Sequence, residues 1–116
     1  MSRIVHVDNS EFFRKLMKTF LSELGHESMS LARGEDAVSE VKAGSADWVI
    51  TGMSLADMGG EEFIKRLAVS DRSAPVIVVT SSDEKTQYKR LNALGVKAII
   101  QKSGDWKSDL AEILTG

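Results

Sequence analysis

The chain has 116 residues, of which 42% are hydrophobic and 28% are charged, and its formal net charge is −2 at pH 7. This length favours one compact domain, residues 1–116, and the composition is ordinary for a globular protein. Lysine and arginine are scattered, so nothing indicates nucleic acid binding. The sequence has no cysteine and only two histidines, His6 and His26, which excludes disulfides and cysteine nucleophiles and argues against a zinc site.

Apolar runs are short against the roughly 20 residues that a membrane-spanning helix needs. The first eight residues read as a strand and lack the charged and apolar regions of a signal peptide. We therefore expect a protein of the reducing bacterial cytoplasm that makes no membrane contact. The chain ends at Gly116, just after its last predicted helix, which is consistent with a domain from a longer protein.

The first half of the chain predicts three strands and two helices. Residues 4–7 are a mostly β-branched run that predicts the first strand. Apolar residues then recur at helical spacing as far as Leu24, and Gly25 is a natural helix stop. Residues 27–31 predict a weaker second strand, followed by a short helix through Ala37 and Val41. The third strand is expected at residues 48–51.

The second half repeats this alternation. A loop at residues 52–60 leads to a helix that begins its apolar face at Phe63. Pro75 opens the clearest strand, residues 76–79, and Ser81-x-x-Glu84 predicts a capping box that begins the fourth helix. Residues 96–100 predict the fifth strand. The last helix is expected to be lined by Trp106, Leu110, Ile113 and Leu114.

Five strand–helix units with nearly continuous apolar strands favour a parallel sheet that is covered by helices on both faces. Right-handed crossovers then favour a doubly wound, five-stranded α/β fold. In such folds the working site lies outside the carboxyl ends of the strands. The residues at those ends are Asp8-Asn9, Thr51-Gly52, Thr80-Ser81 and Gln101-Lys102.

These residues, in this order, resemble the receiver domains of response regulators (CheY-like domains), and the resemblance covers the whole chain. It implies a flavodoxin-like (βα)5 sheet with strand order 2-1-3-4-5 and a place in two-component phosphorelay signalling. In that family two acidic residues end the first strand, where this chain has Asp8 and Asn9. A Thr or Ser ends the fourth strand and a Lys ends the fifth, matched here by Thr80 and Lys102. The phosphoacceptor aspartate of the family falls on Gly52.

Four departures from the family pattern indicate that the phosphorylation switch is lost. Gly52 supplies no nucleophile, and Asn9 replaces a second acid with a neutral amide. One carboxylate, Asp8, gives Mg²⁺ weak binding at most, so we expect no metal. Where the family usually has Tyr or Phe three residues before the lysine, this chain has Ile99, and where proline usually follows the lysine it has Ser103.

Ordinary structural roles explain several of the remaining polar residues. We expect a contact between Asp8 and Lys102, because opposite charges stabilise each other. Asn9 or Ser10 is expected to cap the first helix, and the Thr80 hydroxyl to bond its own loop. His6 lies in an inner strand and is expected to be partly buried and hydrogen-bonded.

Other motifs are also assigned to structure. Residues 59–63, Gly-Gly-Glu-Glu-Phe, spell a signature associated with diguanylate cyclases, but here they lie where a loop enters a helix, so no cyclase is predicted. Trp48 and Trp106 are expected to pack at the core and its edge. Asp57 lies too far along its loop to serve as a displaced phosphoacceptor.

The leading hypothesis is a pseudo-receiver: a non-enzymatic module without cofactor or small-molecule substrate that binds a protein partner or an adjacent effector domain. In the family, the face of the fourth helix, fifth strand and fifth helix docks partners. A second hypothesis places a Ser/Thr phosphorylation site at Thr51, Ser54 or Ser81. A third is a small-ligand binder or enzyme of the flavodoxin-like type, with its ligand in the space that Gly52 leaves at the strand ends. The predicted interaction face comprises Lys85, Lys89, Arg90, Lys97 and Trp106.

Overall fold

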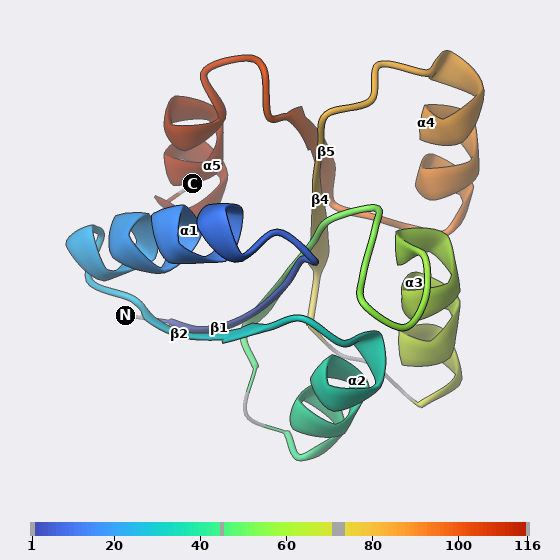
Figure 1. Cartoon of the computed structure of the whole chain (residues 1–116), viewed down its shortest axis with the longest axis horizontal. Helices are drawn as coiled ribbons and strands as arrows, with labels where there is room; N and C mark the ends of the chain where they lie inside the picture. Colours follow the sequence, from blue (N-terminus) through green and yellow to red (C-terminus); the bar gives the residue numbers. More distant parts are fainter. Residues whose placement is uncertain (1, 45, 71–73, 116) are drawn as a thin grey trace.

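The computed structural model describes residues 2–44, 46–70 and 74–115 (Figure 1). In these residues strands and helices alternate along the chain. The strands are β1 (Arg3–Val7), β2 (Glu27–Leu31), β3 (Trp48–Thr51), β4 (Val76–Thr80) and β5 (Ala98–Gln101). The helices are α1 (Glu11–Glu23), α2 (Gly34–Lys42), α3 (Gly60–Val69), α4 (Lys85–Ala93) and α5 (Trp106–Thr115).

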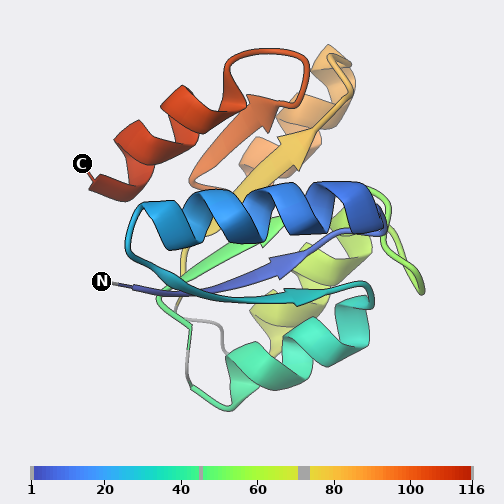
Figure 2. The same cartoon turned by 60° about the vertical axis from the view of Figure 1, so that its left-hand side comes forward.

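The strands form one parallel sheet in the order β2-β1-β3-β4-β5, which confirms the predicted topology. Val5 of β1 lies between Met29 of β2 and Val49 of β3, so the register of the first three strands is fixed by apolar residues. Helices α1 and α5 cover one face, and α2, α3 and α4 cover the other (Figures 1 and 2). All strands run in the same direction, so their carboxyl ends share one edge (Figure 2).

The hydrophobic core has two parts, one on each face of the sheet. Beneath α1 and α5, Ile4 and Ile77 pack with Met17 and Leu110. On the other face the sheet packs against α2, α3 and α4. Every residue of β4 is buried, and residues 76–79 form the continuous apolar run that is expected for a strand covered on both faces.

Two helix ends show where local chemistry was predicted correctly and where it was not. The Ser10 hydroxyl accepts a hydrogen bond from the Phe13 amide at 3.1 Å, which confirms Ser10 as the cap of α1. The capping box at Ser81 was wrong, because α4 begins at Lys85 and its N-cap, Glu84, makes no side-chain cap. Instead, the preceding loop is held by short hydroxyl side chains that bond its own backbone.

The start of the fifth strand also differs from the prediction. It begins at Ala98, two residues later than predicted, because the chain turns at Leu94-Gly95, where Gly95 has a positive φ of 85°, and residues 96–97 lead from this turn into the strand. The Lys97 amide already donates to the Val76 carbonyl at 2.7 Å, so pairing with β4 starts at the end of this turn.

The Gly-Gly-Glu-Glu-Phe segment begins a helix, as the sequence predicted. Gly59 is the N-cap residue of α3, and Glu61 and Glu62 lie in its first turn, where acidic side chains favour the helix dipole. A Cβ at Gly60 would lie 2.5 Å from the Gly52 carbonyl oxygen, so only glycine allows α3 to approach the end of β3 so closely.

None of the helices in the described part of the chain has the length and apolar character that spanning a membrane requires.

Candidate functional site

The carboxyl edge of the sheet brings together residues from four strand ends. Asp8 follows β1, Gly52 follows β3, Thr80 ends β4 and Lys102 follows β5. The Lys102 ammonium lies 2.9 Å from Asp8 Oδ2, which confirms the predicted ion pair. Asp8 is 4% exposed, so this is a buried carboxylate with a directly bonded cation. We call Asp8, Gly52, Thr80 and Lys102 the cleft residues.

Asp8 is fully engaged by the protein. Its second oxygen, Oδ1, accepts a hydrogen bond from the Ser10 amide at 2.8 Å. Its backbone carbonyl accepts from the Arg14 guanidinium at 2.7 Å. Lys102 is held from another side, because its ammonium lies 4.2 Å from the centroid of the Phe13 ring. The pair therefore joins β1, α1 and the end of β5.

Gly52 is buried, and its missing side chain leaves a space that Asp8 occupies. A Cβ added at Gly52 would lie 2.5 Å from Asp8 Oδ2 and 3.0 Å from its Cγ. The backbone of Gly52 is also engaged: its amide donates to the Val7 carbonyl at 2.9 Å, and its carbonyl accepts from the Thr51 hydroxyl at 2.8 Å. The Asp8 carboxylate therefore occupies the space into which a side chain at position 52 would extend.

Thr80 and Asn9 complete the edge without converging on Asp8. The Thr80 side chain is buried, and its hydroxyl oxygen accepts a hydrogen bond from the Ser82 amide at 3.1 Å. This confirms the prediction that Thr80 bonds its own loop. Asn9 is exposed, and its backbone amide donates to the Ser54 carbonyl at 3.1 Å.

The donor set does not fit a divalent metal. A Mg²⁺ ion needs oxygens that are free to bind it, and the protein usually supplies at least one carboxylate for this. Both oxygens of Asp8 are already bonded, and the Gly52 carbonyl accepts from Thr51. Among the described residues, no group of three or more His, Asp or Glu side chains could hold a metal ion.

The residues of the predicted interaction face differ in their surroundings. Lys85, Lys89 and Lys97 are exposed, whereas Arg90 forms an ion pair with Glu61 at 3.0 Å. Trp106 is half-buried and turns toward α1. Its ring centroid lies 5.0 Å from that of Phe13 and 5.4 Å from that of Phe20.

The two other positions that the sequence singled out, Ile99 and Trp48, pack against the core. Ile99 lies against the part covered by α2, α3 and α4. Trp48 lies against the part covered by α1 and α5, which agrees with its predicted packing role.

His6 differs from the prediction of a partly buried, hydrogen-bonded side chain. It is 0% exposed, and neither ring nitrogen has a hydrogen-bond partner among the described residues. Its ring faces α1, 6.0 Å from the Phe13 centroid, so its surroundings are largely apolar. Burial lowers the pKa of His6 to about 4, so the imidazole is neutral at pH 7.

Asp57 has a role that the sequence did not reveal. Its carboxylate accepts hydrogen bonds from the amides of Gly34 at 2.6 Å and Glu35 at 3.1 Å, so it caps α2 from a distant loop. Burial alone would raise the pKa of Asp57, but these two amides and Arg33 hold it below its usual value. No local signal predicts this, because the cap and the helix are 23 residues apart.

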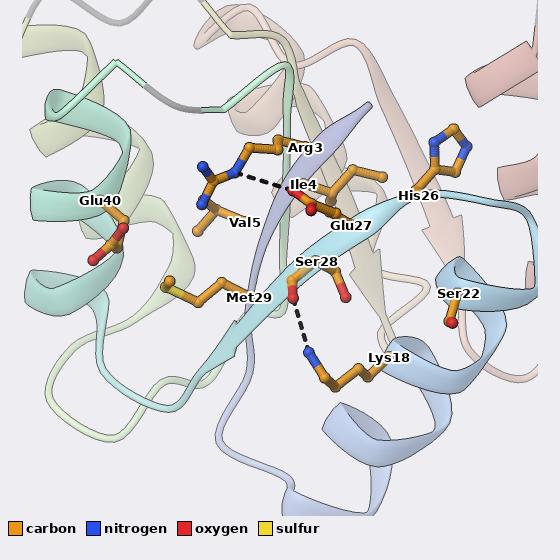
Figure 3. A pocket seen from close by; sticks show the side chains of 10 residues that line it. All are labelled: Arg3, Ile4, Val5, Lys18, Ser22, His26, Glu27, Ser28, Met29 and Glu40. Atoms are coloured by element: carbon orange, nitrogen blue, oxygen red, sulfur yellow. Dashed lines mark hydrogen bonds and ion pairs between the residues drawn. The ribbon is translucent and has the colours of Figure 1, made fainter. Parts of the chain in front are cut away.

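A hollow of about 460 Å³ lies elsewhere, along the edge strand β2 (Figure 3). Met29 and Glu40 line it on the α2 side of the sheet, and Lys18 and Ser22 line it on the α1 side. The Lys18 ammonium donates to the Ser28 carbonyl at 2.8 Å, which blocks part of the strand edge. The polar groups that line the hollow do not converge on one point, so the hollow defines no ligand site.

The sheet order and the cleft residues together define a receiver-type α/β domain. The family model for the response regulator receiver domain matches residues 4–114. The chain therefore belongs to the response regulator receiver domain family.

Individual relatives are similar over most of this chain. The chain is 30% identical over 118 residues to the protein-glutamate methylesterase/protein-glutamine glutaminase of Bacillus subtilis, covering 97% of this chain and 33% of the enzyme. The chain spans about a third of the length of this enzyme, of the same enzyme from Halalkalibacterium halodurans and of the regulator of RpoS from Escherichia coli.

Solved structures show the same fold. The chemotaxis protein CheY4 of Vibrio cholerae superposes with a TM-score of 0.86 at 22% identity, covering 99% of this chain and 97% of CheY4. The receiver domain of the sensor histidine kinase PA1611 from Pseudomonas aeruginosa gives a TM-score of 0.87 at 17% identity, covering 98% and 94% of the two chains. That structure contains a magnesium ion coordinated in its active site cleft.

Proposed function

We propose that this receiver domain works by binding a protein partner and does not accept a phosphoryl group. The observation that carries the proposal is the relationship between Gly52 and Asp8. Where the family resemblance places the phosphoacceptor, this chain has a glycine, and the Asp8 carboxylate lies 2.5 Å from the point where a Cβ would stand. The position therefore lacks a nucleophile and also lacks room for one.

The chemistry of acyl phosphate formation supports this proposal. The reaction needs a carboxylate oxygen that is free to attack phosphorus, and cations that stabilise the charge of the transferring group. Asp8 is the carboxylate of the cleft, and its two oxygens accept from Ser10 and Lys102. An attack by Asp8 would require breaking its ion pair inside a buried site.

Magnesium binding is also expected to be weak. In the PA1611 receiver domain the cleft holds magnesium. In this chain Lys102 neutralises the buried carboxylate, and Asn9 contributes an amide in place of an acid. A dication would have to displace the bonded ammonium and lose its own tightly held water molecules.

The surface formed by α4, β5 and α5 is the proposed docking face. Lys85, Lys89 and Lys97 are exposed there and have no ion pair among the described residues, whereas the charge of Arg90 is paired with Glu61. Three unpaired ammonium groups favour a partner with acidic side chains, since complementary charge steers association. Trp106 packs on α1, so it is expected to support this face from behind and not to anchor the partner.

Loss of phosphorylation chemistry can be tested by NMR. Acetyl phosphate or beryllofluoride with Mg²⁺ should produce no saturable shifts at residues 8, 52, 80 and 102, and the intact mass should not change. A saturable response at these residues, or a gain of one phosphoryl group, would show that the cleft is chemically active.

Partner binding is tested by variants of the basic face. The variant K85E/K89E should lose capture of an acidic partner, with or without a phosphoryl donor. The control K65E reverses an exposed charge on α3 and should keep it. Equal loss in both variants would show that the interaction is nonspecific or lies elsewhere.

The alternative of Ser/Thr phosphorylation finds less support. Thr51 is 0% exposed, and its hydroxyl donates to the Gly52 carbonyl, so a kinase could not reach it in the folded chain. Ser54 and Ser81 are exposed, but among the described residues no side-chain hydrogen bond or ion pair of either serine marks it as a regulated site. Intact mass after isolation from the native cell distinguishes this alternative from the proposal above.

A further inference from the structure

The loop between β4 and α4 is held by a series of three hydrogen bonds that links the cleft to the proposed docking face. At the cleft end, the Thr80 hydroxyl oxygen accepts from the Ser82 amide at 3.1 Å. Two residues further, the Ser82 hydroxyl oxygen accepts from the Glu84 amide at 3.1 Å. At the helix end, the Tyr88 hydroxyl donates to the Ser82 carbonyl at 2.7 Å. Ser82 is therefore bonded from both sides.

We propose that Tyr88 is a positioning residue that fixes the β4–α4 loop in one conformation, and that it acts on Thr80 through the backbone of Ser82. The proposal rests on the proposed function in one respect, that α4 contributes to the docking face. It goes further by assigning the rigidity of that face to one side chain, and it adds a residue that the family resemblance does not single out.

The position of Tyr88 in the fold makes this role specific. Tyr88 lies in the first turn of α4, whose N-cap provides no side-chain hydrogen bond. Its hydroxyl reaches back six residues to the Ser82 carbonyl, so the helix is attached to the loop by a side chain where a cap would ordinarily attach it. Tyr88 is half-buried, so its ring adds packing while its hydroxyl is directed by this bond.

Strand β5, on the other side of this face, offers no comparable hydrogen bond at position 99. Position 99 of β5 is occupied by isoleucine, whose apolar side chain packs against the core and cannot form a hydrogen bond. Thr80 is 3% exposed, so its hydroxyl depends on nearby backbone groups for a partner. The Ser82 amide provides that partner only while the loop keeps its present shape. Tyr88 therefore acts on the Thr80 hydroxyl through the Ser82 backbone, which both side chains bond.

Hydrogen exchange of the full chain tests the proposal without a partner. In Tyr88→Phe, the Ser82 amide should exchange about fivefold faster, which corresponds to the loss of one hydrogen bond of about 1 kcal/mol. Amides in β1 and α1 should keep their protection. Unchanged exchange at Ser82, or an equal increase throughout the chain, would overturn the proposal.

A double-mutant cycle tests the coupling between Tyr88 and Thr80. Thr80→Val removes the acceptor of the Ser82 amide, so adding Tyr88→Phe should increase exchange at Ser82 no further. Thr80→Ser keeps the hydroxyl and should restore the sensitivity to Tyr88→Phe. Ser82→Ala is the matched control, because it removes only the bond to Glu84 and leaves both backbone groups of Ser82 in place. Additive effects of the two substitutions would show that Tyr88 has only a local structural role.

The role assigned to Tyr88 and the docking proposal can fail separately. If the exchange results are as expected and no acidic partner binds the α4 face, Tyr88 does hold the β4–α4 loop but the docking proposal fails. If a partner binds equally well to the wild-type chain and to Tyr88→Phe while exchange at Ser82 is unchanged, the docking proposal stands and the role assigned to Tyr88 is wrong.

Discussion

The Asp8 carboxylate fills the space that a side chain at Gly52 would occupy. The carboxylate of Asp8 extends to within 2.5 Å of the point where a Cβ on Gly52 would stand, and this oxygen is the one that bonds the Lys102 ammonium. Any side chain at position 52 must therefore displace the ion pair. A substitution at Gly52, after β3, therefore affects Asp8 after β1 and Lys102 after β5.

Gly52→Ala should destabilise the protein by about 1–3 kcal/mol, the usual cost of adding a methyl group to a packed site. The cause is displacement of Asp8 from Lys102, so the cost should largely disappear when Gly52→Ala is made in an Asp8→Ala background. Urea unfolding of the four chains in this cycle measures the coupling.

The matched control for that cycle is Gly104→Ala. A Cβ at Gly104 would lie 3.7 Å from the Gln101 carbonyl oxygen, which is an ordinary contact. This variant should change the free energy of unfolding by less than about 0.5 kcal/mol. Equal losses at Gly52 and Gly104 would show that a methyl group costs as much away from Asp8 as beside it, so that Asp8 is not the cause.

Removing the cation of the buried pair should cost more than removing the whole pair. Lys102→Met leaves Asp8 buried without its cation and should lower the free energy of unfolding by about 1–3 kcal/mol. Asp8→Asn combined with Lys102→Met should recover part of this loss, because no uncompensated charge remains. Lys65→Met, at an exposed position of α3, is the control. A double variant less stable than Lys102→Met alone would contradict this account.

The fold and part of the cleft followed from the sequence, because they depend on regular features. Apolar strand runs predicted the parallel sheet, and parallel strands place their carboxyl ends together, which led directly to the Asp8–Lys102 contact. The cap at Ser10 also followed, since it needs only neighbouring residues. These predictions rest on periodicity and on local hydrogen bonding, both of which a single sequence contains.

The features that the sequence did not predict correctly depend on where helices begin, on side-chain directions and on contacts between distant residues. The position of the Asp8 carboxylate in the space beside Gly52 is set by Lys102 and the Ser10 amide together. The cap that Asp57 provides for α2 comes from another unit of the fold. The Ser81 capping box was wrong because α4 begins only at Lys85 and its N-cap is Glu84, whose side chain makes no cap.

His6 should make the protein sensitive to mild acid. Its pKa in the folded state, about 4, lies below the ordinary value of 6.5, mainly because of burial, so the folded state binds fewer protons than the unfolded state between these values. The contribution of neutral His6 to the free energy of unfolding is therefore fully present above about pH 6.5. It is lost as the pH drops toward 4, which lowers the free energy of unfolding by up to about 3 kcal/mol. Nearby Asp8 opposes this effect, whereas Lys102 and Arg14 add to it.

The variant His6→Leu isolates this contribution. It keeps an apolar group of similar size beneath Phe13 and removes the titrating group, so its free energy of unfolding should fall less between pH 7 and pH 4.5 than that of the wild type. Urea unfolding at several pH values measures the difference. Parallel pH profiles for the two proteins would show that His6 is not the group responsible.

The cap that Asp57 provides predicts a loss confined to α2. Asp57→Ala leaves the Gly34 and Glu35 amides without their acceptor and should cost about 1 kcal/mol, the usual value of a helix cap. Because the pKa of Asp57 is lowered in the folded state, its contribution is present at neutral pH and is lost as the pH falls through that lowered pKa. Amide exchange should rise in the first turn of α2 and stay unchanged in α1. Asp36→Ala, which removes an exposed acid of the same turn that does not cap it, should leave those amides protected. If both variants expose the turn equally, the helix dipole and not the hydrogen-bonded cap is the stabilising interaction.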